Sequence, residues 1–135
     1  MTNDKKSTLN VLAIEPFGCE GHKNINSYFL KMFCDLAKVT FMAPEGYLEN
    51  CYTHYRFDIP KELLKARSKI GTRWSQGKVI RYITNNVELE KYDLVVFLSY
   101  ETISFKLCWP NNCKVFLVEH NNIEKIHKNS IKQFF

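Results

Sequence analysis

The apolar residues of this chain follow two different spacings in turn, which predicts strands separated by helices. Residues 9–14 and 38–43 are short β-rich runs, and a proline closes each of them. Between these runs, apolar side chains recur every three or four positions, as on one face of a helix that Asn24 or Asn26 could cap. The first third of the chain therefore predicts a strand, a loop with two glycines, a helix and a second strand parallel to the first.

The rest of the chain continues the same alternation. It predicts, in chain order, an edge strand at 52–59, helices at 61–67 and 74–89, a strand at 93–98, a short helix at 102–109, a strand at 114–118 and a last helix after Asn122. Strands that alternate with helices indicate an α/β fold. We expect one doubly wound, Rossmann-like parallel sheet over residues 1–135, with residues 1–8 as a flexible N-terminus and the first strand in its interior.

Two groups of apolar side chains are expected to form the core of this sheet. From the strands we expect Val11, Ala13, Val95, Phe97, Phe116 and Val118. From the helix at 74–89 we expect one stripe made of Trp74, Val79, Ile80, Ile83 and Val87.

Composition narrows the class of protein. The 135 residues are 45% hydrophobic and 24% charged, as in ordinary globular domains, which excludes a disordered or low-complexity chain and fits a single domain. The longest apolar run, residues 94–98, is far shorter than the roughly 20 residues of a membrane-spanning helix. The polar N-terminus lacks a signal-peptide core, so we expect a cytoplasmic protein with reduced cysteines. Cys108 and Cys113 have no second pair beside them, and we expect no metal site.

Positive charge is concentrated in one segment. The chain has 19 Lys and Arg against 14 Asp and Glu, a net charge of +5, and seven of the basic residues lie within Lys61–Arg81. A solvated helix face is the common explanation of such a run, and peripheral contact with an anionic membrane surface is the alternative. No nucleic-acid-binding motif accompanies this charge, so we expect no nucleic-acid partner.

Two loops that follow strands carry candidate binding residues. Gly18, Gly21 and His22 lie between the first strand and its helix, where glycines admit a close approach and a helix start attracts phosphate. Their spacing matches neither a dinucleotide-binding motif nor a P-loop, and a plain tight turn is the alternative. His120 and Asn121 follow the strand at 114–118, where an imidazole can bind a sugar hydroxyl or carry a proton, or simply belong to a turn. The carboxyl ends of parallel strands share one edge, so we expect both loops there.

The segments Val11–Lys23 and Val118–Asn121 together resemble the N-terminal half of a GT-B glycosyltransferase, most closely the retaining glycosyltransferase family 4 and its relatives. The resemblance implies a Rossmann-like domain that binds the acceptor, beside a second domain that holds a nucleotide-sugar. It also implies that Gly18 and Gly21 lie against the donor phosphates. His120 would be the catalytic contact to the transferred sugar, with His22 and Asn121 as further binding residues.

The resemblance spans nearly all of this chain but only part of such an enzyme, because the paired glutamates of the donor domain would lie beyond residue 135. It implies a nucleotide-sugar co-substrate, a glycan or lipid-linked acceptor of the cell envelope, and no cofactor or metal. We therefore expect one half of a hexosyltransferase, truncated at its C-terminus. This half should be inactive without the donor-binding domain. The alternatives are a stand-alone flavodoxin-like module that binds a nucleotide or phosphorylated ligand, and a non-functional gene fragment.

Overall fold

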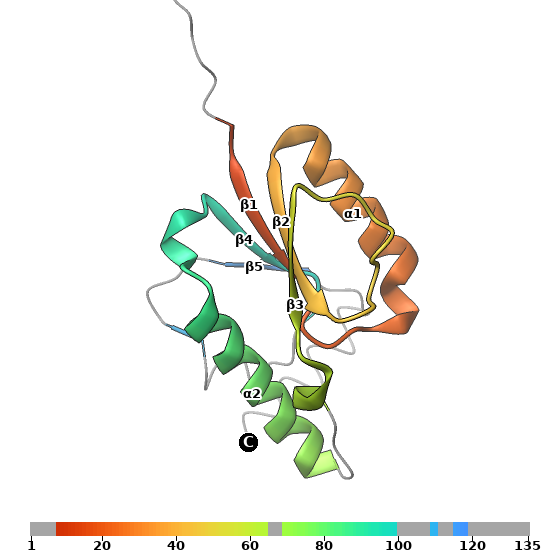
Figure 1. Ribbon diagram of the computed structural model, residues 1–135, viewed down its shortest axis with the longest axis vertical. Helices are drawn as coiled ribbons and strands as arrows, with labels where there is room; N and C mark the ends of the chain where they lie inside the picture. Colours follow the sequence, from red (N-terminus) through yellow and green to blue (C-terminus); the bar gives the residue numbers. More distant parts are fainter. Residues whose placement is uncertain (1–7, 65–68, 100–108, 111–114, 119–135) are drawn as a thin grey trace, which may run out of the picture.

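The computed structural model describes residues 8–64, 69–99, 109–110 and 115–118, with the side chains of 69–73 left out (Figure 1). Its elements are β1 (Asn10–Ile14), α1 (Lys23–Leu36), β2 (Lys38–Pro44), β3 (Tyr55–Ile59), α2 (Lys69–Asn86), β4 (Leu94–Phe97) and β5 (Phe116–Leu117). Three short 3-10 helices lie at Glu20–His22, Lys61–Leu64 and Leu89–Lys91.

All five strands belong to one parallel sheet with the order β3-β2-β1-β4-β5. β1 lies in the interior, where Val11 is opposite Val39 of β2 and Leu94 of β4. The predicted α/β fold, the parallel pairing and the interior position of the first strand are therefore confirmed. β3 and β5 form the two edges of the sheet.

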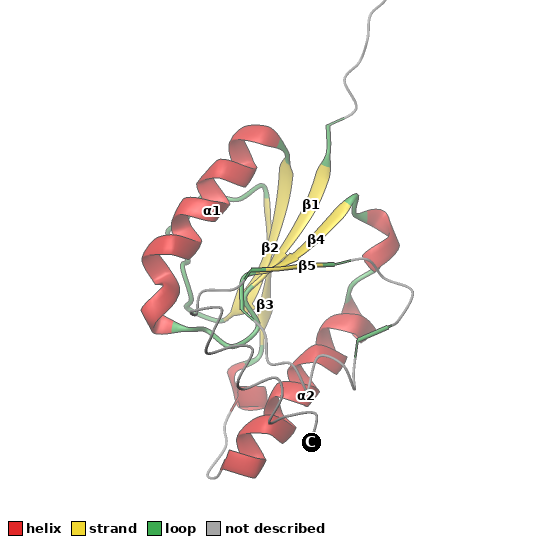
Figure 2. Cartoon of the chain, turned by 180° about the vertical axis from the view of Figure 1, so that it is seen from behind, coloured by secondary structure: helices red, strands yellow, loops and turns green. Residues whose placement is uncertain are grey.

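The sheet lies between the two long helices, as Figures 1 and 2 show from opposite sides. Side chains alternate along each strand, so neighbouring residues face different helices. The face toward α2 buries Leu12, Ile14, Met42, Val95 and Phe97 against Val79, Ile80 and Ile83. The face toward α1 buries Val11, Ala13, Val39, Phe41 and Val96 against Leu30. Burial on both faces is what a parallel sheet requires, because helical connections cover it on each side.

The start of α1 differs from the sequence prediction. The helix begins at Lys23, and its N-cap residue is His22, whose side chain makes no capping hydrogen bond. Asn26 is fully buried in the first turn and bonds to other parts of the chain, so neither Asn24 nor Asn26 is the cap. A polar side chain such as that of Asn26 predicts a helix start, but its partners, Glu15 and Tyr47, lie outside the helix.

The second helix is longer than predicted, and its buried stripe is shifted. α2 begins at Lys69, and residues 61–64 form a 3-10 turn instead of the start of an α-helix. Trp74 is 65% exposed, while Val79, Ile80 and Ile83 are buried as expected. Five positions separate Trp74 from Val79, which at about 100° per residue places the two side chains roughly 140° apart around the helix. The predicted stripe was therefore wrong at its first residue.

The strand near the C-terminus is shorter and more exposed than predicted. β5 contains only two residues, with Phe116 at 64% exposure, and Val118 after it is half-buried. Among the described strands it has a single neighbour, β4, so its side chains gain less cover than those of β4. The predicted helices at 102–109 and after Asn122 lie outside the described residues, apart from Trp109.

Candidate functional site

The carboxyl end of β1 carries a buried carboxylate that organises the loop after it. Glu15 has no exposed surface, and its Oε1 accepts hydrogen bonds from the backbone N–H groups of Phe17 and Cys19, both at 3.3 Å. The loop thus folds back around the side chain that directly follows β1. Two amides that a phosphate would need are already bound within the protein.

Two further donors reach Glu15 from distant parts of the sequence. Ser99, directly beyond β4, donates its hydroxyl to Oε1 at 2.5 Å, and Asn26 of α1 donates Nδ2 to Oε2 at 3.2 Å. From β1 the chain continues through β2 to β3 on one side of the sheet, and then adds β4 and β5 on the other side. The strand order therefore reverses between the neighbours β1 and β4. Glu15 therefore ties together both strands at that reversal and the helix that covers them.

Tyr47, in the connection from β2 to β3, completes this cluster. Its hydroxyl accepts a hydrogen bond from Asn26 Nδ2 at 3.0 Å and donates to the carbonyl of Cys19 at 2.8 Å. Burial, with a further contribution from the nearby carboxylate of Glu15, raises the pKa of Tyr47 to about 12. The hydroxyl accordingly stays neutral and acts as a donor. Within the described residues, Oδ1 of Asn26 is buried without a hydrogen-bond partner.

The two glycines of the loop have different roles. Gly18 has a φ of +63°, and a Cβ added there would lie 3.3 Å from Cγ of Pro44. Both its backbone conformation and its packing favour glycine. Gly21 is exposed, and a Cβ added there would meet nothing within 4 Å. Gly21 is thus the position at which a ligand could approach the backbone.

The charges around Gly21 partly cancel. Lys23 Nζ lies 2.7 Å from Oε2 of Glu20 and 5.7 Å from the centre of the Tyr47 ring. His22 is half-buried beside it and precedes α1. The 3-10 helix Glu20–His22 runs directly into α1, so the N–H groups of His22 and Lys23 already donate to the carbonyls of Cys19 and Glu20. The N–H groups of Glu20 and Gly21, at the start of the 3-10 helix, have no acceptor within it and carry partial positive charge. The loop can therefore offer a ligand the amide N–H groups of Glu20 and Gly21, with the ammonium group of Lys23 nearby.

Three of the five predicted site residues lie together in the part of the chain that the structure describes. Gly18, Gly21 and His22 lie in one loop at the carboxyl edge of the sheet. His120 and Asn121 lie outside the described residues, so their expected approach to this loop stays a prediction. In the basic segment, Lys61, Lys78 and Arg81 are exposed.

The four residues that build the cluster were not among the site residues predicted from the sequence. Glu15 and Ser99 each follow an apolar strand, which is the same signal that singled out His120. That signal could have found both. Tyr47 and Asn26 carry no comparable signal, because their roles depend on how the β2–β3 connection and α1 pack against the first loop.

Comparisons with known proteins add no relative: no family model, no curated protein and no solved structure matches this chain. In the part of the chain that the structure describes, no group of three or more His, Cys, Asp or Glu side chains is placed to hold a metal ion. Its cysteines Cys19, Cys34 and Cys51 are free thiols. None of the helices described is both long and apolar enough to cross a membrane.

Proposed function

We propose that this chain forms the Rossmann-like, acceptor-binding domain of a retaining GT-B glycosyltransferase, which works together with a donor-binding domain. The observation that carries the proposal is the β1–α1 loop, which lies where the strand order reverses and leaves Gly21 open. In doubly wound sheets, ligands bind outside the carboxyl ends of the strands at this reversal. The strand order β3-β2-β1-β4-β5 is also the one usual in that fold class.

The loop suits a role in stabilising a leaving diphosphate. When a sugar leaves its nucleotide, negative charge grows on the diphosphate, and fixed donors already in place lower the barrier. The start of the 3-10 helix before α1 supplies the amide N–H groups of Glu20 and Gly21, and Lys23, which is paired with Glu20, supplies a positive charge. Glu15 binds two loop amides and is itself held by Asn26 and Ser99, which keeps these donors in position before a ligand arrives.

The remaining roles rest on the family resemblance. His120 would contact the transferred sugar, Asn121 would add a neighbouring polar contact, and His22 would lie near the donor phosphates. The nucleotide-sugar is the co-substrate, and the acceptor is a glycan or a lipid-linked sugar. The basic segment Lys61–Arg81 would favour an acceptor held at an anionic membrane surface.

Backbone NMR of the full chain, titrated separately with UDP-glucose and GDP-mannose, tests the donor side of this proposal. We expect weak binding, with a dissociation constant on the order of 1 mM, because only half of the cleft is present. The shifted amide signals should cluster at residues 18–22. Gly21→Val should remove these shifts without unfolding the protein, because the space around Gly21 is open. Asn85→Val, which adds the same side chain at an exposed position of α2, is the matched control.

The outcome separates the alternatives. Shifts confined to another surface, or none at either nucleotide-sugar, would contradict the proposal. Tight, saturable binding by this chain alone would favour the stand-alone binding module instead.

Turnover tests the catalytic assignment. Together with a donor-binding domain of the same enzyme class, the chain should transfer sugar, and alone it should not. His120→Ala should lower turnover by about 100-fold or more, as expected when a positioned imidazole is removed. Unchanged turnover in this variant would exclude His120 as the catalytic contact.

A further inference from the structure

The edge strand β3 offers a row of backbone groups to a partner. β3 pairs with β2 on one side, and no described strand pairs with it on the other (Figure 1). Open edges of this kind are usually shielded by charged side chains, above all lysine, or by prolines or bulges. The five residues of β3, Tyr55–Ile59, contain neither lysine nor proline, and their two charged side chains, Arg56 and Asp58, are paired with each other.

The hydrogen-bond pattern identifies which residues of β3 face outward. The carbonyl of Ile59 accepts a hydrogen bond from the N–H of Glu45, so Ile59 directs its backbone groups toward β2. Successive residues of a strand direct these groups to opposite sides, so Tyr55 and Phe57 also face β2. The N–H and C=O groups of Arg56 and Asp58 therefore point away from the sheet, toward the open edge.

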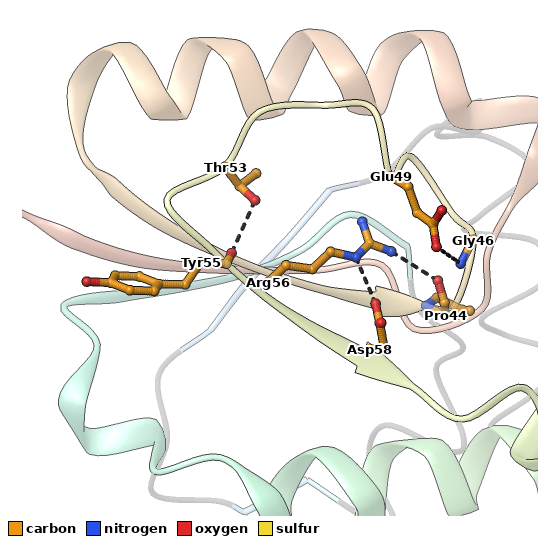
Figure 3. Close-up of polar contacts among 7 residues, drawn as sticks. All are labelled: Pro44, Gly46, Glu49, Thr53, Tyr55, Arg56 and Asp58. Atoms are coloured by element: carbon orange, nitrogen blue, oxygen red, sulfur yellow. Dashed lines mark hydrogen bonds and ion pairs between the residues drawn. The ribbon is translucent and has the colours of Figure 1, made fainter.

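These same two residues carry opposite charges on one face of β3. Nε of Arg56 donates to Oδ1 of Asp58 at 2.8 Å, and an Nη of Arg56 donates to the carbonyl of Pro44 at 3.2 Å (Figure 3). The guanidinium also lies 5.3 Å from the centre of the Phe41 ring. The side chain of Asp58 is 50% exposed, so its carboxylate is accessible from the edge.

The opposite face of β3 is aromatic. Tyr55 is 54% exposed and Phe57 is 50% exposed, with Lys38 Nζ 5.1 Å from the centre of the Tyr55 ring. Half-exposed aromatic side chains beside an unpaired strand edge favour a partner that also supplies a strand with aromatic side chains.

We propose that β3 pairs antiparallel with β3 of a second copy of this chain, about a two-fold axis between the two Phe57 residues. In this register Arg56 lies opposite Asp58 of the partner subunit, and Asp58 lies opposite Arg56 of the partner subunit. Because both residues direct their backbone groups outward, each opposed pair can exchange two N–H to C=O hydrogen bonds. The Phe57 side chains meet at the centre of the aromatic face.

Charge selects this register over its neighbours. Other antiparallel registers also pair outward-facing residues with one another. In each of them the two-fold axis is shifted along β3, and the nearest two have it one residue to either side of Phe57. An axis at Arg56 would oppose two arginines, and an axis at Asp58 would oppose two aspartates, both of which are unfavourable. The axis at Phe57 opposes unlike charges twice and closes the assembly as a dimer.

Sedimentation equilibrium of the full chain over a range of concentrations tests the proposal. A short strand pair buries little area, so we expect a reversible dimer with a dissociation constant of about 10–100 µM. Arg56→Asp and Asp58→Arg should each weaken self-association about tenfold or more, because each places like charges opposite one another. Equimolar mixing of these two variants should restore dimers, because the unlike charges then face one another across the pair. The double variant R56D/D58R should dimerise by itself.

Controls keep the result specific to β3. Arg81→Asp makes the same charge change at an exposed position of α2 and should leave association unchanged. Circular dichroism checks that each variant is folded. In the wild-type chain, hydrogen exchange at the amides of Arg56 and Asp58 should slow as dimers form.

Three outcomes would overturn the proposal. They are a wild-type chain that stays monomeric at every concentration, association that persists in both single variants, and a mixture of the two variants that fails to associate. The first would leave the edge free for a strand of a different protein. None of these outcomes bears on nucleotide-sugar binding, which is tested at the loop after β1 and not at the edge strand β3.

Discussion

Glu15 and Gly18 together determine the shape of the β1–α1 loop. The carboxylate of Glu15 binds two loop amides, and Gly18 adopts a positive φ where the chain turns close to Pro44. A buried carboxylate is unfavourable unless hydrogen bonds replace its lost water, and Glu15 accepts four of them. The loop is therefore ordered by a residue that the glycine pattern alone does not reveal.

The two glycines of this loop should respond differently to alanine. Gly18→Ala should lower the free energy of unfolding by about 1–2 kcal/mol, because a left-handed conformation is strained for alanine and the new Cβ crowds Pro44. Gly21→Ala should be neutral or slightly stabilising, because its surroundings are open. Urea unfolding of the two variants measures the difference. Equal effects at both positions would show that the loop is not held as described.

Tyr47 should make stability depend on pH in alkaline solution. Its pKa rises from an ordinary value of 10.0 to about 12 in the folded chain, mainly because the phenol is buried. The unfolded chain therefore releases this proton first, and the stability that the neutral phenol contributes is complete below about pH 10 and lost as the pH rises toward 12. Phenolate absorbance should show one tyrosine ionising late. In Tyr47→Phe that late step should disappear, and its persistence would assign it to another tyrosine.

Among the elements, strands were easier to predict than the phase and length of helices. The run at 93–98 has apolar residues at both its odd and its even positions, and it contains β4, which is buried on both faces of the sheet. The 61–67 run looks helical, yet the structure places a 3-10 turn at Lys61–Leu64. Trp74 shows why helix phase is harder: apolar composition suggested burial, but the other buried positions of α2 place it on the solvent side.

The candidate site was predictable only in its local part. Gly18, Gly21 and His22 are adjacent in sequence, so their common loop follows from the first strand and helix. Ser99 reaches the same loop from beyond β4, and no local pattern encodes that contact. It depends on β4 lying beside β1, which is a property of the strand order.

The buried end of β4 should not tolerate a charge. Phe97 is fully buried and packs edge-on against Trp109, with ring centres 5.0 Å apart. Phe97→Asp should prevent accumulation of folded protein, because an unpaired buried carboxylate costs several kcal/mol. Phe116→Asp, the same change at an exposed position of β5, should alter the free energy of unfolding by no more than about 0.5 kcal/mol. Folded yield and thermal unfolding compare the two variants. Similar losses in both would mean that β5 is covered.

In the molecule as a whole, stability should decrease from the middle of the sheet toward its edges. β1 is hydrogen-bonded on both sides, and its residues from Leu12 to Ile14 are completely buried. β5 contributes two exposed residues to one edge. Native-state hydrogen exchange should therefore be slowest in β1 and fastest in β5, because local opening exposes edge strands first. Faster exchange in β1 than in β5 would contradict the strand order.

The hydrogen bond from Ser99 to Glu15 joins a late part of the chain to an early one. The two residues are 84 positions apart, whereas β1, α1, β2 and β3 follow one another within the first 59 residues. Because synthesis runs from the N-terminus, all of those elements are made before Ser99 is added, and until then Glu15 lacks one of its four donors. β4 and the residues after it supply both that hydroxyl and the second neighbour of β1. The loop at the carboxyl edge becomes complete only when β4 is synthesised and inserted.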